Sequence, residues 1–175
     1  MDDTITIQTI ATPVGTLGVA LSPAGLGRLT FADEPIAACE AWAQRWQPQA
    51  RPARQDRRVD LLAEQLNAYF AGALRVWTVP LDLRGTPFQL RVWRAVLAIP
   101  YGEVRSYSEI ATAIGQPRAV RAVGAANGAN PIPILVPCHR LIGKDGSLIK
   151  YGGGLALKRR LIELEGAPVR ERVSG

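Results

Sequence analysis

The sequence predicts a mixed α/β (α+β) protein in two parts, with a small antiparallel sheet and its helices first and a mostly α-helical part second. Three observations predict this arrangement. The chain begins with short stretches that alternate apolar and polar residues between turns containing glycine and proline. Two helix-capping signatures lie in the second half. The first half is nearly neutral, whereas the second half is strongly basic.

Three strands are predicted at the start of the chain. Residues 4–10 read Thr-Ile-Thr-Ile-Gln-Thr-Ile, an alternation with the two-residue period of a strand. Residues 16–21 and 26–31 are expected to form two more strands, after turns at 12–15 and 22–25. Turns this short join neighbouring antiparallel strands. The sequence therefore predicts a three-stranded antiparallel sheet.

Two helices and an extended segment are predicted after these strands. The first helix covers residues 35–46, with Cys39 on its buried face as a small core residue. Residues 47–58 contain two prolines and no aromatic or large aliphatic side chain, which is typical of a loop. Apolar residues at helical spacing predict a second helix that ends at Gly72, and residues 76–83 are expected to be extended.

The second half begins with three predicted helices. Residues 86–89 (Thr-Pro-Phe-Gln) form a capping box with proline at the first helical position, and they begin a helix that ends near Leu97. Residues 106–109 (Ser-Tyr-Ser-Glu) are a second capping box, for a short helix that ends near Ile114. An alanine-rich helix is predicted at residues 118–127. Two short helices joined by a glycine-containing turn form a helix-turn-helix.

A turn, a glycine-rich loop and a helix are predicted near the end of the chain. Residues 143–146 favour a hairpin-type turn. Residues 151–154 (Tyr-Gly-Gly-Gly) favour a loop whose backbone another group can approach closely. Residues 155–165 predict the last helix. The basic residues assigned to its solvent side are Lys158, Arg159 and Arg160.

The alanine-rich helix has a nearly bare face. Small side chains let a backbone approach another surface closely, but packing inside a core uses the same property, so both interpretations stay open. Arg118 and Arg121 near its N-terminal end favour anion binding there, because the helix dipole and the side chains both attract a phosphate. The small residues are Ala119, Ala122, Gly124, Ala125, Ala126 and Gly128.

Charge divides the chain near residue 85, where we place the domain boundary. Residues 1–84 carry 8 Lys or Arg and 9 Asp or Glu, a net charge of −1, whereas residues 85–175 carry 13 and 6, a net charge of +7. A basic half beside a neutral half is typical of a protein that binds a polyanion. A solvated basic surface is the simpler alternative.

Composition argues against several classes of protein. No apolar run approaches the roughly 18 residues of a membrane span. The N-terminus has no apolar signal region, so a cytoplasmic protein is expected. Two cysteines and one histidine are too few for a disulfide framework or a tetrahedral metal site. We therefore expect no metal, no cofactor and no membrane partner.

The stretch from Asn130 to Arg140 carries the strongest candidate chemistry. Three prolines stiffen this segment, which leads to Cys138 and, beside it, His139, the only histidine of the chain. A cysteine becomes a nucleophile when its thiol loses a proton, and an imidazole can promote that loss. A buried structural cysteine with a histidine beside it by chance is the alternative, and these residues alone leave both open.

Five motifs in this chain resemble, in order and spacing, those of the O6-alkylguanine-DNA alkyltransferases. They are Arg121-Ala122-Val123-Gly124, Asn130-Pro131, Pro137-Cys138-His139-Arg140, Tyr151-Gly152-Gly153-Gly154 and Glu165. The likeness extends more loosely over residues 4–166. The four-cysteine zinc domain of the adaptive-response members is absent, so the chain resembles the bacterial stand-alone form. The resemblance implies a ribonuclease-H-like α/β domain at 1–84 and a helical DNA-binding and alkyl-acceptor domain at 85–175.

The resemblance also implies direct reversal of DNA damage. The Cys138 thiolate would take the alkyl group from O6 of guanine and keep it as a thioether, so each molecule would act once. His139 would deprotonate Cys138 through a water, and Glu165 would orient His139. Asn130 would brace the loop, and Tyr107 would donate a proton toward N3 of guanine.

The same resemblance assigns residues to the DNA and to the flipped base. Arg121 would enter the base stack where the target nucleotide leaves it, and the bare helix would lie in the minor groove of double-stranded DNA. The expected DNA-binding residues are Arg118, Arg121, Tyr107, Ala119, Ala122, Gly124 and Ala125. The expected base pocket consists of Pro133, Leu141, Tyr151 and Gly152.

One position departs from the family pattern. Lys150 stands before Tyr151, where the family usually has a small residue. A positive φ at this position would strain a lysine, whereas a lysine that faces DNA could contact a phosphate. The shape of the pocket and the range of alkyl groups therefore stay open, as does activity on O4-alkylthymine.

Two other functions are compatible with parts of the sequence. A non-catalytic lesion-binding relative would bind the damaged base without taking up its alkyl group, and the intact Cys138 argues against it. An unrelated cysteine hydrolase would use the Cys-His pair with multiple turnovers, but no further feature of the sequence supports one. We expect a monomer, and cooperativity on DNA stays open.

Overall fold

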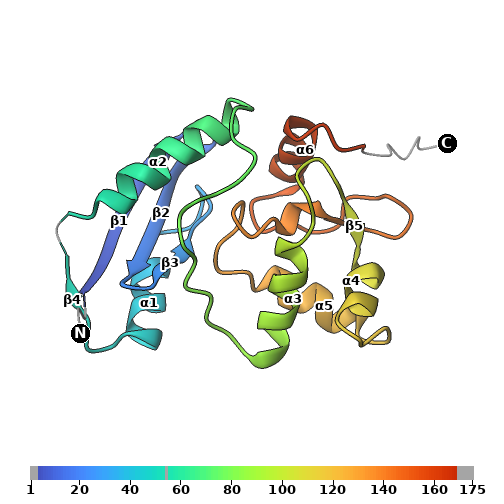
Figure 1. The fold of residues 1–175 in the computed structure, drawn as a ribbon, viewed down its shortest axis with the longest axis horizontal. Helices are drawn as coiled ribbons and strands as arrows, with labels where there is room; N and C mark the ends of the chain where they lie inside the picture. Colours follow the sequence, from blue (N-terminus) through green and yellow to red (C-terminus); the bar gives the residue numbers. More distant parts are fainter. Residues whose placement is uncertain (1–3, 54, 169–175) are drawn as a thin grey trace. The chain divides into compact units, whose positions relative to one another are not determined.

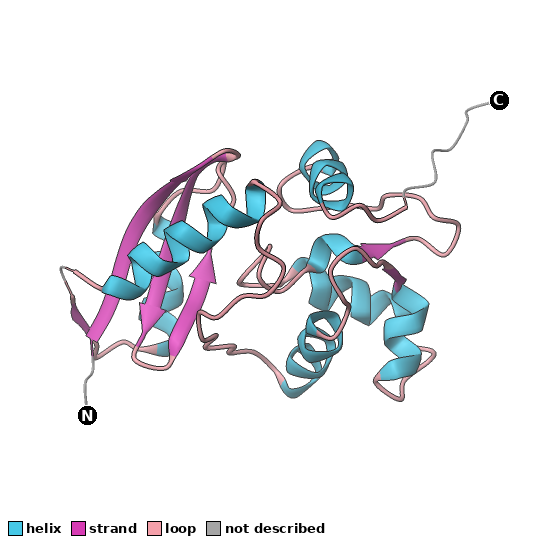
Figure 2. Ribbon diagram, turned by 45° about the horizontal axis from the view of Figure 1, so that its top comes forward, coloured by secondary structure: helices cyan, strands magenta, loops and turns pink. Residues whose placement is uncertain are grey.

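The computed structural model describes residues 4–53 and 55–168, and the chain divides into two compact units between Arg84 and Gly85. Figures 1 and 2 show an α/β first unit and a mostly helical second unit. The mixed fold class predicted from the sequence is confirmed. Among the described residues, no helix combines the length and the apolar composition that crossing a membrane requires.

The sheet of the first unit has four strands in the order β3-β2-β1-β4. Strands β1 (Thr4–Thr12), β2 (Gly15–Ser22) and β3 (Gly25–Leu29) form the predicted antiparallel meander. The fourth strand, β4 (Arg51–Pro52), pairs in parallel with the start of β1. The prediction of three strands and a continuous loop missed β4, because two residues are too few to show an alternating pattern.

Two helices cover opposite faces of this sheet (Figures 1 and 2). Ile5 of β1 packs with Cys39 in one buried cluster. The hydroxyl of the next residue, Thr6, donates to the Asp56 carboxylate at the start of the other helix, at 3.4 Å. Successive strand residues face opposite sides of a sheet, so the two helices lie on different faces. They are α1 (Ala37–Trp46) and α2 (Arg57–Phe70).

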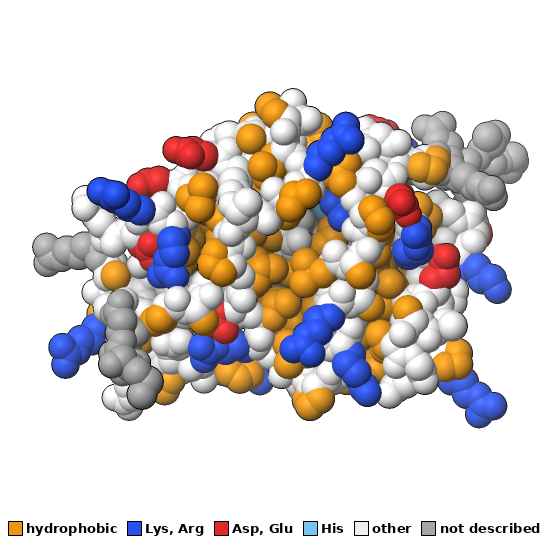
Figure 3. Space-filling view, viewed as in Figure 1, with side chains coloured by type: hydrophobic (Ala, Val, Ile, Leu, Met, Phe, Trp, Pro, Cys, Tyr) orange, Lys and Arg blue, Asp and Glu red, His pale blue; other side chains and the backbone are white. Residues whose placement is uncertain are grey.

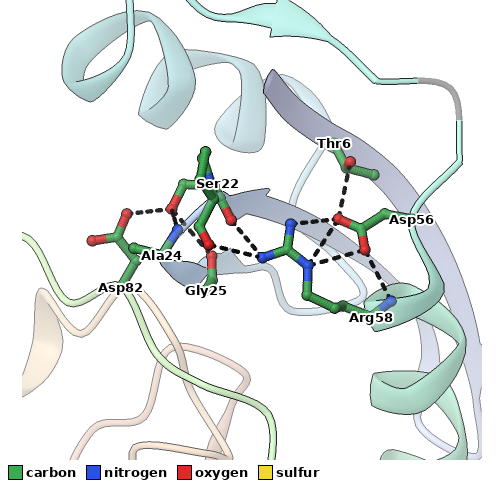
Figure 4. A network of polar contacts seen from close by, with 8 residues as sticks. Thr6, Ser22, Ala24, Gly25, Asp56, Arg58 and Asp82 are labelled. Atoms are coloured by element: carbon green, nitrogen blue, oxygen red, sulfur yellow. Dashed lines mark hydrogen bonds and ion pairs between the residues drawn. The ribbon is translucent and has the colours of Figure 1, made fainter. Parts of the chain in front are cut away.

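A polar network fixes the start of α2 to the sheet (Figure 4). Asp56 caps the helix by accepting from the Arg58 backbone N–H at 2.9 Å, and its carboxylate pairs with the Arg58 guanidinium at 2.6 Å. The same guanidinium donates to the Ser22 carbonyl at 2.8 Å, and the Ser22 hydroxyl donates to Asp82 at 2.5 Å. One network therefore joins α2, the end of β2 and the segment before residue 85.

The described part of the second unit contains, in chain order, α3 (Pro87–Leu97), β5 (Arg105–Ser106), α4 (Tyr107–Ala113), α5 (Val120–Gly128), the 3₁₀ helix η1 (Cys138–Arg140), β6 (Leu141–Ile142) and α6 (Leu155–Leu164). Both predicted capping boxes are present, because Thr86 accepts from the Gln89 N–H and Ser106 from the Glu109 N–H, each at 3.2 Å. Strands β5 and β6 pair in parallel. This pairing places the start of α4 beside the segment that follows η1.

Helix α5 begins two residues later than the sequence predicts. Ala119 is its N-cap, so Arg118 lies in the preceding turn. The Ala119 N–H donates to the Gln116 carbonyl at 2.9 Å, which holds this segment in the turn. The inner side of α5 packs against α3, where the Trp93 indole N–H donates to the Ala126 carbonyl at 2.8 Å.

Candidate active site around Cys138

Asn130 closes the loop that leads to Cys138. Its amide nitrogen donates to the Val136 carbonyl at 2.9 Å, and its amide oxygen accepts from the Ile132 N–H at 3.0 Å. A backbone hydrogen bond of 2.9 Å from the Val136 N–H to the Ile132 carbonyl completes the turn. Cys138 then begins η1 and is 4% exposed. This stiff approach therefore presents an almost enclosed sulfur.

The backbone of this loop is strained at Ile134, whose φ is 74°. No other non-glycine residue in the described ranges has a positive φ. The conformation is rare for a β-branched residue, and it persists where the surrounding structure holds it. Ile134 is 1% exposed, so packing supplies that restraint. Lys150 does not have a positive φ, and it is exposed, so the strain considered for it from the sequence is absent.

His139 and Arg140 share one buried carboxylate. The His139 Nε2 lies 2.8 Å from Glu165 Oε1, and both side chains are fully buried. Arg140 donates to both oxygens of Glu165, from Nε at 2.8 Å and from Nη2 at 3.0 Å, and to the Ile99 carbonyl at 2.6 Å. Glu165 is the C-cap residue of α6. The end of α6 therefore orients the histidine beside Cys138.

Burial controls the protonation of this site. It lowers the pKa of His139, and the neighbouring Glu165 carboxylate offsets this only in part, so the imidazole is neutral at pH 7. Burial also raises the pKa of the Cys138 thiol, although hydrogen bonds from the Asn130 and Tyr151 side chains act in the opposite direction. The thiol therefore needs a base, or another favourable charge, before it can react near neutral pH.

Lys158 is buried, which corrects its assignment to the solvent side of α6. Its exposed fraction is 0%, and its Nζ donates to the Ile149 carbonyl at 2.9 Å. The helical spacing explains the difference: Lys158 lies three and four positions before Leu161 and Ile162, which are both buried. Lys158 also interacts electrostatically with Cys138. Its position on the apolar face could have been predicted from that spacing, but its residue type suggested solvent.

Tyr107 is the first residue of α4 and is partly buried. Burial raises its pKa, and the nearby Cys138 adds to that effect, so the phenol stays protonated at neutral pH. The Asn127 side chain hydrogen-bonds Tyr107, and its amide nitrogen also donates to the Cys138 carbonyl at 3.4 Å. Sequence reasoning missed Asn127. Its one signal was a polar residue on the otherwise apolar side of the alanine-rich helix.

The small residues of α5 have two roles. Its inner positions, Val123, Ala126 and Asn127, are buried, so part of the helix does pack in the core. The outer side is bare. Its exposed or partly exposed residues are Ala119, Arg121, Ala122, Gly124 and Ala125, and Arg118 is exposed in the turn before the helix.

A cleft of about 530 Å³ lies beside this outer side. Tyr107, Arg121 and Gly124 line it, together with Ile149. Cys138 and the residues expected to form the base pocket do not line it. Of those residues, Pro133 and Leu141 are buried, Tyr151 is partly buried and Gly152 is exposed.

Basic side chains are spread out on the face shown in Figure 3. Lys and Arg side chains there stand apart, among exposed hydrophobic side chains, rather than in one patch. Several arginines are also paired with carboxylates, as Arg105 is with Glu103 at 2.6 Å. On this face, charge alone therefore does not mark a binding surface.

Known proteins resemble this chain over both units. The ribonuclease-like domain of 6-O-methylguanine DNA methyltransferase matches residues 5–83, and the DNA binding domain matches residues 87–167. A methylated-DNA–protein-cysteine methyltransferase of Mycobacterium tuberculosis strain H37Rv is 52% identical over 158 residues, which cover 90% of each chain. The inducible methyltransferase of the same name from Bacillus subtilis strain 168 is 44% identical over 147 residues, 84% of this chain and 82% of that one.

A solved structure agrees with these matches. The crystal structure of Mycobacterium tuberculosis OGT in complex with DNA has a TM-score of 0.78 and 48% sequence identity, and the match covers 93% of this chain and 95% of that one. The match to the DNA binding domain includes the loop around Cys138 and Glu165, which pairs with His139. This chain therefore belongs to the 6-O-methylguanine DNA methyltransferase family.

Proposed function

We propose that this protein repairs alkylated DNA by moving the alkyl group from O6 of guanine to the sulfur of Cys138. Its family and its relatives, which are named methylated-DNA–protein-cysteine methyltransferases, support alkyl transfer. The environment of Cys138 is the observation that supports its assignment as the acceptor of the alkyl group. It is an almost enclosed thiol, held by the Asn130 loop and followed directly by the buried His139–Glu165 pair.

The reaction requires a thiolate, because a neutral thiol is a poor nucleophile. His139 takes the proton of Cys138 through a water, and the Glu165 carboxylate stabilises the positive charge that this places on the imidazole. The sulfur then attacks the alkyl carbon in line with the leaving oxygen. An S–C bond forms as the C–O bond breaks, and the electron pair of that bond stays on guanine. The product is a thioether, so each molecule reacts once.

The leaving guanine needs a proton to become neutral. Tyr107 donates it toward N3 and recovers a proton from solvent, while His139 releases the thiol proton to solvent, so the net effect is to move one proton from the thiol to the base. Two observations support this role: Tyr107 lines the cleft beside α5, and its raised pKa keeps the phenol protonated. Asn127, which hydrogen-bonds Tyr107, would hold the ring in place.

Double-stranded DNA is the proposed partner, bound by a monomer through the outer side of α5. The small side chains of that side would let the helix backbone enter the minor groove. Arg121 would fill the gap in the base stack when the damaged nucleotide rotates out of the duplex, and Arg118 would contact a phosphate. The basic second unit, with a net charge of +7, supports this partner.

Intact mass measurement tests the proposal. Incubation with a duplex that contains O6-methylguanine should add one methyl group to the protein and no more. Cys138→Ala should abolish this gain, whereas Cys39→Ala, the matched control, should leave it unchanged, because Cys39 lies in the core of the first unit. Lesion binding without a mass gain would favour a non-catalytic lesion-binding protein. Repeated turnover of an ester without a stable adduct would favour a hydrolase.

A further inference from the structure

Lys158 is a fully buried cation that the mechanism above does not use. Lysine is almost never fully buried unless its charge is compensated. Its Nζ has one hydrogen bond, to the Ile149 carbonyl at 2.9 Å. Within the described ranges, no carboxylate forms an ion pair with it. A carbonyl dipole compensates the charge of a buried ammonium group only in part. A nearby anion would stabilise Lys158 further.

The groups that face Lys158 identify this anion. The Nζ lies 5.9 Å from the centre of the Tyr107 ring on α4, and it interacts electrostatically with Cys138 and His139 of η1. His139 is neutral, and Tyr107 is protonated at neutral pH. The buried carboxylate nearest to this histidine, Glu165, is already paired with Arg140. The thiolate of Cys138 is therefore the remaining group that can carry a compensating negative charge.

We propose that Lys158 is a positioning residue, whose buried ammonium group stabilises the thiolate of Cys138 and holds the segment at Ile149 against the cleft. The proposal rests on the acceptor role of Cys138 proposed above. Two effects follow from one side chain. The charge favours the reactive form of the sulfur, and the hydrogen bond fixes the backbone next to a residue that lines the cleft beside Tyr107.

The charge state of Lys158 agrees with this role. Burial lowers its pKa to about 8, and Cys138 acts in the opposite direction. The ammonium form therefore predominates at pH 7 but lies close to its titration range. Alkylation leaves a neutral thioether that cannot ionise, so it prevents the formation of the thiolate that favours the ammonium form. The pKa of Lys158 should consequently fall once the protein has reacted.

The first test compares three variants in a Cys39→Ala background, in which Cys138 is the only thiol. Lys158→Met removes the charge and the donor, Lys158→Gln keeps a donor without charge, and Lys158→Arg keeps the charge. The rate of reaction with free O6-benzylguanine is measured from pH 6 to pH 10. Lys158→Met and Lys158→Gln should lower the rate about tenfold at pH 7 and shift the profile about one unit to higher pH. Lys158→Arg should restore part of the rate.

The same profile can overturn the proposal. An equal loss of rate at every pH, or a Lys158→Arg variant that reacts no faster than Lys158→Met, would show that Lys158 serves the fold and not the thiolate. No change at all would show that it serves neither. Circular dichroism and thermal melting identify any variant that does not fold.

The second test uses the unsubstituted lysine and so does not depend on the folding of a variant. The chain has three lysines, Lys144, Lys150 and Lys158. Carbon-13 labelling at Cε gives three NMR signals, which Lys144→Arg and Lys150→Arg assign. The titration midpoint of Lys158 should fall by about one unit after Cys138 is alkylated. An unchanged midpoint would contradict the proposal. If the protein does not react with O6-benzylguanine, iodoacetamide can block the thiol instead, which separates this result from a failure of the proposed function.

Discussion

At the scale of single residues, one buried carboxylate joins two neighbouring side chains of the second unit. Glu165 accepts hydrogen bonds from Arg140 and lies 2.8 Å from His139 Nε2, with its side chain fully buried. A buried carboxylate is costly to desolvate, and it is tolerated here because both of its oxygens are paired. The two partners therefore depend on Glu165, one for its charge and the other for its orientation.

Replacing this carboxylate should affect both stability and activity. Glu165→Gln leaves the Arg140 guanidinium buried without its counter-charge, which we expect to cost about 3–5 kcal/mol of the free energy of unfolding. It also removes the negative charge that supports a protonated His139, so reaction with O6-benzylguanine should slow. Urea unfolding and single-turnover kinetics measure the two effects.

Glu163→Gln is the matched control for this variant. Glu163 lies on the same helix, its side chain is 60% exposed, and its ion pair with Arg159 is long at 3.9 Å. An exposed pair of this kind contributes about 0–1 kcal/mol. If the two variants behaved alike, Glu165 would not have the role that we assign to it.

Some residue-level features were accessible from the sequence and others were not. The burial of Lys158 follows from its helical spacing to Leu161 and Ile162, so weighting periodicity above residue type would have predicted it. The positive φ of Ile134 could not be predicted, because only the closed loop imposes it. The pairing of His139 with Glu165, 26 residues apart, came from the family resemblance and not from spacing.

At the scale of elements, local signals predicted well wherever they involve neighbouring residues. The capping boxes at Thr86 and Ser106 join residues three apart, and both are present. Strand β4 was missed because its pairing with β1 joins residues about 47 positions apart and spans only two residues. Helix α2 combines both kinds of contact. Its cap joins neighbouring residues, but the Arg58 side chain also forms a distant hydrogen bond to the end of β2.

The cap of α2 can be tested directly. Asp56→Ala removes the acceptor for the Arg58 N–H and the partner of its guanidinium, which we expect to lower the free energy of unfolding by about 1–2 kcal/mol. Hydrogen bonds from Arg58 hold the pKa of Asp56 below its usual value. This stabilisation is therefore present at neutral pH and is lost as the pH falls through the lowered pKa. The variant should show a weaker loss of stability in acid.

Asp60→Ala serves as the control, because Asp60 is an exposed acidic residue in the same first turn of α2. It should change the free energy of unfolding by about 0.5 kcal/mol or less. Chemical unfolding at pH 7 and at pH 3 compares the two variants with the original protein. An Asp56 variant with unchanged acid sensitivity would argue against the network of Figure 4 as its source of stability.

At the scale of the whole molecule, charge and structure divide the chain at the same place. The boundary between the compact units lies at residue 85, where the net charge changes from −1 to +7. The fold class was predictable because strand alternation and helix caps are dense in the sequence. The enclosed sulfur was not predictable from composition, since it depends on Asn130 and on packing around the loop. Charge alone therefore predicted a half suited to a polyanion, and the mechanism was expected only from the family resemblance.

Comparing reaction in duplex DNA with reaction of the free base separates DNA binding from the chemical step. If Arg121 fills the base stack as proposed, Arg121→Ala should slow repair of O6-methylguanine in a duplex by about tenfold or more. Reaction with free O6-benzylguanine needs no flipping and should change little. Equal losses on both substrates would place Arg121 in the chemistry and remove the distinction between the outer side of α5 and the buried site at Cys138.

Two further variants extend this comparison to proton donation and to phosphate contact. Tyr107→Phe should slow both reactions, because proton donation belongs to the proposed chemical step. Arg118→Ala should instead weaken duplex binding and reduce its salt dependence by about one counterion. An unchanged rate with free O6-benzylguanine for Tyr107→Phe would contradict its role as the proton donor.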